Sequence, residues 1–243
     1  MTPPTATDVL TPTNPRGLRD LPFEIPTVEP AEKRRAKRIL DALTERYPEA
    51  TCALAHSAPH ELLIATILSA QCTDVAVNKA TPALFKAFPT PADYAAATPT
   101  KIEPYVKSLN FFRNKARAVH ESMAAIVDEH GGKTPRTMDE LLALRGVARK
   151  TANVVLGNAF GINNGVVVDT HVNRLAKRFD LAPEDATAQT VERRLMALFP
   201  RDRWTNLSHL LIWHGRLVCK ARNGLCADDA ICKRYCLNAK EPS

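Results

Sequence analysis

The chain contains no long apolar run. Its 243 residues include no stretch of the about 18 apolar residues that a membrane-spanning helix needs. The first residues do not combine a basic segment with an apolar one, so no secretory signal is expected. Asp8, Asp20, Glu24 and Glu29 argue against an organelle transit peptide. These absences predict a cytosolic protein without a membrane-spanning helix, whose six cysteines are reduced thiols or metal ligands rather than disulfides.

Alternating strand patterns are nearly absent, and we find no internal repeat. Only Val166–Val168 resembles a strand, and it is too short to require a sheet. From residue 31 nearly to the end, apolar residues recur at helical spacing, and residues 60–70 are apolar on every side, as in a buried central helix. Thr137 followed by Glu140 predicts a capping box at one helix start. The sequence therefore predicts an all-α fold.

Residues 1–30 differ from the rest of the chain. They contain seven of the 18 prolines, mixed with threonine, and show no helical period. Such a composition buries too little apolar surface to offset the entropy of ordering. We expect a disordered Pro/Thr-rich tail over residues 1–30, to which the sequence assigns no function.

The formal net charge is +7, from 33 Lys and Arg against 26 Asp and Glu. A basic balance favours a polyanionic partner. Nucleic acid is the leading class of partner and an anionic membrane surface is the second, although many basic proteins bind neither.

A short turn joins two helices in the middle of the chain. An apolar helix ends near Leu144, residues 145–148 (Arg-Gly-Val-Ala) follow, and a second helix then begins. The first N–H groups of that helix have no partner within it and form a ready anion site. Gly146 lets the backbone approach closely, and Arg149 and Lys150 add charge, so a DNA phosphate is the expected ligand. The alternative is an ordinary corner between helices with a solvated Lys/Arg pair, because short motifs match often.

Lys150 offers a primary amine at the start of this second helix, and Asp169 offers a carboxylate after a buried apolar run. A lysine must lose its proton before it attacks carbon. The positive end of the helix and the adjacent Arg149 both favour the neutral amine. A nearby carboxylate can accept a proton or stabilise an oxocarbenium ion. Taken singly, the two residues have ordinary interpretations, a surface lysine and the cap of a helix that starts at Thr170. Together they suggest chemistry on a nucleotide sugar.

Four cysteines lie near the C-terminus, separated by six, five and three residues: Cys219, Cys226, Cys232 and Cys236. Four thiolates in a short segment indicate a metal centre. Structural zinc sites usually contain a pair of cysteines two residues apart, which is lacking here, so a four-thiolate iron–sulfur cluster is the better prediction. Lys220 and Arg222 lie in the first loop, where such a cluster would present them to phosphate. The alternative is four unliganded thiols.

Together these features resemble the endonuclease III family of DNA glycosylases, from about residue 31 to the end. The segment Ser-Ala-Gln-Cys-Thr-Asp at 69–74 is similar to a family segment whose glutamine fills the gap left by a flipped base, so Gln71 is the expected plug. The segment 108–115 is similar to the family's wedge loop, with Phe111 as the wedge. By the same resemblance, Lys150 falls on the Schiff-base lysine and Asp169 on the catalytic aspartate.

Two departures from the family pattern stand out. The family turn is usually Leu-Pro-Gly-Val-Gly, whereas this chain has Arg145 in place of the proline and Ala148 in place of the second glycine. The family's cluster cysteines are separated by six, two and five residues, so the third and fourth ligands here are expected to take a different path around the cluster.

The resemblance implies an all-α, two-domain helix-hairpin-helix fold. One domain is expected to be a helical barrel over 51–162, and the other to combine 31–50 with 163–243 and hold a 4Fe-4S cluster. Lys150 and Asp169 are expected to face each other across the cleft. The expected DNA contacts are Gln71, Phe111, Arg145, Gly146, Val147, Ala148, Arg149, His171, Lys220 and Arg222.

The implied function is a bifunctional DNA glycosylase and AP lyase, a monomer that acts on oxidised pyrimidines and abasic sites in double-stranded DNA. We expect it in the cytoplasm, associated with a bacterial-type nucleoid, with no membrane partner. One alternative is the related adenine glycosylase, which is monofunctional, lacks the lysine and usually carries a further C-terminal domain. Another is a non-enzymatic module that uses the turn and the basic loop only to grip DNA. A pure iron–sulfur electron carrier would leave the turn and the basic charge unexplained.

Overall fold

The protein is described by a computed structural model that covers residue 18 and residues 20–239. Every regular element in this part of the chain is a helix, and it contains no strand, which confirms the all-α prediction. The strand-like run 166–168 is an extended connector in which Val166 is buried. No helix in the described ranges is long and apolar enough to cross a membrane.

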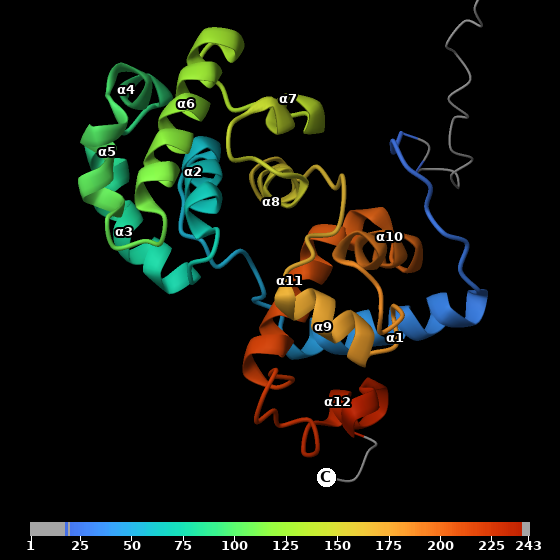
Figure 1. The fold of residues 1–243 in the computed structure, drawn as a ribbon. Coiled ribbons are helices and arrows are strands. Elements are labelled where there is room, and N and C mark those ends of the chain that lie inside the picture. Colours follow the sequence, from blue (N-terminus) through green and yellow to red (C-terminus); the bar gives the residue numbers. More distant parts are fainter. Residues whose placement is uncertain (1–17, 19, 240–243) are drawn as a thin grey trace, which may run out of the picture.

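The helices form two lobes, each around its own hydrophobic core (Figure 1). The internal lobe contains α2 (Pro59–Ser69), α3 (Asp74–Ala87), α4 (Pro91–Ala96), α5 (Pro99–Val106), α6 (Phe112–His130), α7 (Met138–Ala143) and α8 (Arg149–Phe160). The terminal lobe contains α1 (Pro30–Arg46), α9 (Thr170–Arg178), α10 (Ala188–Leu198), η1 (Arg201–Arg203), α11 (Trp204–Leu217), α12 (Ala230–Tyr235) and η2 (Leu237–Ala239). The chain crosses between the lobes twice, after α1 and after α8. We propose that the lobes are the two domains expected from the sequence.

The centre of the internal lobe is α2. All its residues from Leu62 to Leu68 are buried, as its apolar sequence predicted, and α8 packs against it. The longest helix, α6, ends at Gly131, which has a φ of 57° and forms the left-handed cap. Thr137 caps α7 by accepting the N–H of Glu140, and its hydroxyl meets the Glu140 carboxylate. These local signals fix the helix ends that lead into the turn before α8.

The segment before α1 differs from its expectation. Leu21 and Ile25 are buried in the core of the terminal lobe. Asp20 accepts two hydrogen bonds from the guanidinium of Arg201, at 2.7 and 2.8 Å. The prediction of a disordered tail that reaches residue 30 is therefore wrong for residues 20–29, because their apolar side chains find a surface on helices distant in sequence. Residues 1–17 and 19 of the expected tail lie outside the described part.

Candidate functional site

A cavity between the two lobes contains both residues that were singled out for chemistry. Lys150 lines it from α8, and Asp169 lines it from the connector that precedes α9. The internal lobe also contributes Thr66, Ser69, Asp74, Val154 and Asn158. The terminal lobe also contributes Val167, Thr205, Ser208, His209, Ile212, Trp213 and Arg216. An amine and a carboxylate from different lobes thus border one concave surface.

Lys150 is the second residue of α8 and its side chain is exposed. Ala148 is the N-cap of α8, and within the described residues no side chain caps this helix. The N–H groups of the first turn of α8 are thus not capped by a side chain, and the anion site expected at this turn stays a prediction. The amine and these donors lie at the same end of the helix.

Asp169 is held in place by the helix that it begins. Its Oδ1 accepts hydrogen bonds from the N–H groups of His171 and Val172, both at 2.8 Å. The ordinary interpretation of Asp169 as a helix cap is therefore correct, and it is compatible with a place in the cavity. Both bonds use Oδ1, and Oδ2 takes no part in this cap.

The turn between α7 and α8 is anchored from both sides. Gly146 has a φ of 78°, and a Cβ there would lie 3.1 Å from the Cβ of Ala118, so the position favours glycine twice over. Val147 is buried, and the hydroxyl of Ser122 donates to the carbonyl of Arg145 at 2.6 Å. The guanidinium of Arg145 is exposed and pairs with Glu121 at 2.9 Å.

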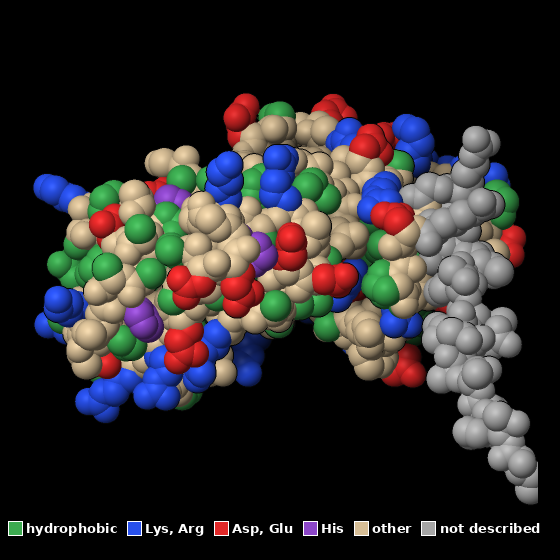
Figure 2. All heavy atoms as spheres, turned by 90° about the horizontal axis from the view of Figure 1, so that it is seen from above, with side chains coloured by type: hydrophobic (Ala, Val, Ile, Leu, Met, Phe, Trp, Pro, Cys, Tyr) green, Lys and Arg blue, Asp and Glu red, His purple; other side chains and the backbone are tan. Residues whose placement is uncertain are grey.

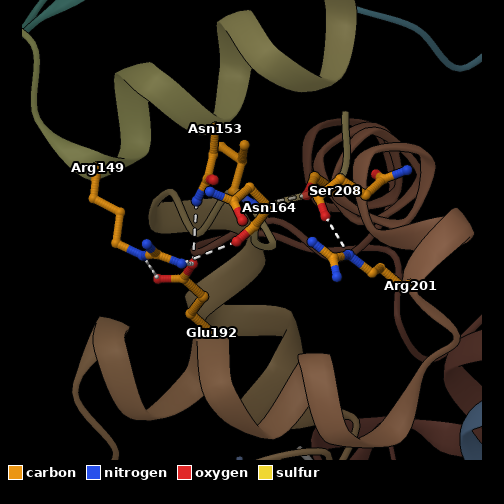
Figure 3. Close-up of polar contacts among 8 residues, drawn as sticks. Arg149, Asn153, Asn164, Glu192, Arg201 and Ser208 are labelled. Carbon is orange, nitrogen blue, oxygen red and sulfur yellow. Dashed lines mark hydrogen bonds and ion pairs between the residues drawn. The ribbon is translucent and has the colours of Figure 1, made fainter. Parts of the chain in front are cut away.

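The side chain of Arg149 has an unexpected environment. Its guanidinium donates to the Glu192 carboxylate, at 3.0 Å from Nε to Oε1, and to the carbonyl of Asn164, at 3.1 Å. Figure 3 shows Arg149 and Asn153 extending from α8 toward Glu192 on α10. The sequence expected this guanidinium on a DNA phosphate, whereas the structure engages it between the lobes.

The expected plug and the expected wedge belong to neighbouring loops. Gln71 and Phe111 both have left-handed backbones, with φ of 54° and 57°. The side-chain amide of Asn110 donates to the carbonyl of Gln71 at 3.0 Å and joins the two loops. Phe111 is 61% exposed, although it is a large apolar residue. Left-handed backbones at non-glycine residues are strained and concentrate at functional sites, so both loops fit a binding role.

The four C-terminal cysteines come together. Their Sγ atoms lie within 4.8 Å of one another, and all four residues are buried. Hydrogen bonds from Cys232 and Cys236, and another from Arg178, hold the pKa of the Cys219 thiol far below its usual value. A thiolate is the form that binds metal. The donor set fits a metal centre with four sulfur ligands, either an iron–sulfur cluster or zinc.

A neighbouring histidine, which the sequence did not assign a role, contacts this cysteine group. The hydroxyl of Tyr47 lies 2.8 Å from Nδ1 of His214, and Nε2 of His214 lies 3.3 Å from the Cys232 sulfur. Burial lowers the pKa of His214, which favours the neutral ring. If the tyrosine donates to Nδ1, the Nε2 proton points at the sulfur. This contact spans 18 residues of sequence, so no local pattern could reveal it.

The remaining predicted DNA contacts are distributed over the terminal lobe. Lys220 and Arg222 are exposed in the loop after Cys219. His171 is partly buried, and its Nδ1 accepts from the guanidinium of Arg174 at 3.1 Å. Burial lowers the pKa of His171. Figure 2 shows basic and acidic side chains interspersed on the face that it presents, so the net positive charge does not form one continuous patch there.

The chain was compared with known proteins. The HhH-GPD family model, which describes a superfamily of base excision DNA repair proteins, matches residues 64–201. The chain is 50% identical over 198 residues to endonuclease III of Synechocystis, a match that covers 82% of this chain and 90% of the relative. It is 42% identical to endonuclease III of Bacillus subtilis, over 78% of this chain and 86% of the relative.

Solved structures agree. A trapped covalent intermediate of endonuclease III with DNA superposes with a TM-score of 0.81 at 41% identity, over 86% of this chain and 97% of that chain. A thermostable thymine-DNA glycosylase, at 19% identity and a TM-score of 0.77, shares the fold.

Proposed function

The chain belongs to the endonuclease III family of the HhH-GPD superfamily, and from that membership we propose which of its residues carry out the chemistry. It is a DNA glycosylase and lyase of base excision repair. We propose that its substrates are oxidised pyrimidines in double-stranded DNA, together with the abasic sites that their removal leaves.

The damaged nucleotide must leave the base stack before its sugar can be attacked, at a cost of a few kcal/mol that is lowest for damaged or mispaired bases. We propose that Gln71 fills the vacated space and that Phe111 is the wedge. Their support is the contact between the two loops through Asn110 and the exposure of the Phe111 ring. Gln71 and Phe111 are both exposed to solvent.

Lys150 is the proposed nucleophile. Its Nζ forms a bond to C1′ of the extrahelical sugar while the bond from C1′ to the base breaks, and the base leaves with a proton. The C1′–O4′ bond then breaks, O4′ takes up a proton and stays on C4′ as a hydroxyl, and the double bond between Nζ and C1′ forms. Removal of a C2′ proton expels the 3′ phosphate, and water releases the lysine. Asp169 is the proposed group that stabilises the positive charge developing on the sugar and relays protons. The observation that carries this proposal is that Lys150 and Asp169 line one cavity from opposite lobes.

Grip on the DNA backbone is assigned to the turn before α8. The free N–H groups at Ala148 and in the first turn of α8 are the proposed phosphate donors, with Gly146 allowing close approach and Val147 anchoring the turn. Arg145, Lys220 and Arg222 add charge at the surface, and His171 lies at the start of α9. Such contacts orient the protein without selecting a base sequence.

We also propose that Cys219, Cys226, Cys232 and Cys236 hold a 4Fe-4S cluster. The support is the burial and mutual proximity of the four thiols. When bound, the cluster supplies a fixed covalent node that ties the loop carrying Lys220 and Arg222 to α12. The unusual cysteine spacing places Cys232 and Cys236 one helical turn apart on α12 and at its end.

A nicking assay tests the proposed function. Wild-type protein is expected to cut a duplex that contains a single abasic site on the 3′ side of that site and to leave an intact control duplex uncut. Lys150→Gln and Asp169→Asn are each expected to lose cutting while they retain binding. A protein that only binds DNA and a monofunctional glycosylase would both leave the abasic duplex uncut. A third duplex with one oxidised pyrimidine separates these two, because the monofunctional enzyme would remove its base without breaking the strand.

A further inference from the structure

We propose that Arg149 and Glu192, covered by Phe23, form an inter-lobe contact that positions Lys150 against Asp169. The inference rests on the proposed roles of those two residues. Arg149 directly precedes Lys150 in the first turn of α8, and Glu192 belongs to α10 in the other lobe. Neither lines the cavity, so both act through their neighbours as positioning residues.

The bond pattern of this contact is specific. Nε of Arg149 lies 3.0 and 3.2 Å from the two carboxylate oxygens of Glu192, and Nη2 lies 3.0 Å from Oε1. One turn further along α8, the amide of Asn153 donates to the same Oε1 at 3.1 Å. Two side chains of one helix thus grip one carboxylate of the other lobe, which fixes both the position and the rotation of α8 (Figure 3).

Burial makes this contact sensitive to change. Glu192 is 8% exposed, and Asn153 is 3% exposed. A buried carboxylate that loses its cation becomes strongly unfavourable, unlike a pair on the surface. With the lobes in this arrangement Glu192 has both Arg149 and Asn153 as partners, and replacing either side of the contact leaves a buried polar group without its partner.

The connector between the lobes is packed onto the same contact. A Cβ at Gly165 would lie within 2.2 Å of Oε1 of Glu192 and 2.5 Å of the amide nitrogen of Asn153. Gly165 lies four residues before Asp169 in the chain. One partner of the contact, Arg149, is the residue next to Lys150. The other, Glu192, packs against the connector that ends at Asp169.

The segment before α1 covers the contact. The ring of Phe23 contacts two guanidinium groups, with its centroid 4.7 Å from Cζ of Arg149 and 4.8 Å from Cζ of Arg193. Cation–π contacts are stronger where water is excluded. The segment is itself fixed by Asp20 and by the buried Leu21. Residues 20–29 therefore cover the contact between Arg149 and Glu192.

A second ion pair between the lobes has a different position. Arg216 on α11 pairs with Asp74 at the start of α3, and both residues line the cavity. Their replacement would alter the site that receives substrate. The Arg149–Glu192 contact lies outside the cavity, so its variants separate positioning from substrate binding.

The test compares Glu192→Ala, Glu192→Gln, Gly165→Ala and Phe23→Ala with wild type. The matched control is Glu32→Gln, which removes an ion pair of α10 with α1 inside the terminal lobe. Single-turnover borohydride trapping at saturating abasic duplex gives the rate of the covalent step, and fluorescence anisotropy gives Kd. Hydrogen exchange of the free protein measures opening at the first turn of α8 and at residues 163–169 without reference to activity.

We expect Glu192→Ala to lower the trapping rate at saturation by about tenfold or more, which is about 1.4 kcal/mol, while Kd changes by less than about threefold. Glu192→Gln should be intermediate because the amide keeps part of the hydrogen bonding. Gly165→Ala and Phe23→Ala test the same contact without removing the carboxylate, so they keep the test decisive should Glu192→Ala not fold. Exchange at both segments should rise in every variant except Glu32→Gln.

Three results would overturn the proposal. The first is a trapping rate in Glu192→Ala and Gly165→Ala equal to that of wild type. The second is a loss of DNA affinity as large as the loss of trapping rate. The third is hydrogen exchange at the two segments no faster than in Glu32→Gln. The second result would make Arg149 a phosphate ligand. If wild-type protein itself forms no trapped complex, the proposed function fails, whereas the exchange measurement still decides whether the contact holds the lobes.

Discussion

Asn110 donates its side-chain amide to the backbone carbonyl of Gln71, and this one bond joins the two loops proposed to occupy the gap in the DNA. The loops come from different helix pairs, α2–α3 and α5–α6. Each loop contains a residue with a strained, left-handed backbone. The bond therefore stabilises the strained backbones and also fixes the relative position of the two loops.

Asn110→Ala is therefore expected to weaken binding to lesion-containing duplex by about fivefold, which corresponds to the roughly 1 kcal/mol of one net hydrogen bond. Binding of undamaged duplex should change less, because the loops engage only where a nucleotide has left the stack. Anisotropy titrations with matched lesion and control duplexes measure both. Gln189→Ala, which removes an exposed amide in the first turn of α10 in the other lobe, is the control. Equal losses on both duplexes would count against the plug and wedge roles.

Close packing of α8 against α11 predicts a second effect. A Cβ at Gly157 would lie 2.3 Å from Oγ1 and 2.9 Å from Cγ2 of Thr205. Gly157→Ala should therefore lower the free energy of unfolding by about 1–3 kcal/mol through overpacking. The double variant Gly157→Ala/Thr205→Ala should recover part of the loss. Urea denaturation measures all four proteins of the cycle, and additive losses in the double variant would disprove the contact.

Burial lowers the pKa of His209 to about 4, while its Nε2 lies 2.7 Å from Oδ1 of Asn158. The unfolded chain takes up this proton below a pH of about 6.5, and the folded protein does so only near pH 4. The contribution of the neutral ring to stability is thus fully present above pH 6.5 and is lost as the pH falls from there toward 4.

Between pH 7 and pH 5, wild type should therefore lose about 2 kcal/mol more stability than His209→Gln, a side chain that does not titrate. Urea midpoints at the two pH values measure the difference. Parallel loss in wild type and variant would show that the buried ring is not responsible.

Metal content is predicted for the C-terminal cysteines. Purified protein should contain about four iron atoms per chain and absorb in the visible range, as a four-thiolate cluster requires. Cys226→Ser should lose most of the iron and expose the loop with Arg222 to proteases, whereas Cys72→Ser in the internal lobe should keep the full iron content. A colourless protein with stoichiometric zinc would contradict the iron–sulfur cluster, although the four cysteines would still form a metal centre.

What the sequence predicted correctly was local. The Thr137 cap, the Gly131 end and the burial of α2 depend on residues within a few positions of one another, so spacing reveals them. The resemblance also indicated Lys150 and Asp169, which the fold brings to one cavity. The cap made by Asp169 had been considered as an alternative to a role in chemistry, and the side chain has room for both.

What the sequence missed depends on the arrangement of the lobes. Glu192 lies in a run of charged residues typical of a solvated helix face, and its partner Arg149 is 43 positions away. Leu21 and Phe23 lie in a proline-rich segment, and the partners of Phe23 belong to helices more than 100 residues further along the chain. The composition of a segment indicates how much apolar surface the segment can bury by itself. It does not indicate whether a helix distant in sequence offers a surface for the segment to pack against.

The most direct test of the central claim is borohydride trapping on a duplex with one oxidised pyrimidine. The account predicts a covalent protein–DNA complex for wild type and a cross-linked peptide that contains Lys150. It predicts no complex for Lys150→Gln at protein concentrations where that variant binds the duplex fully. A trapped complex formed by Lys150→Gln, or a cross-link that maps to another amine, would contradict it.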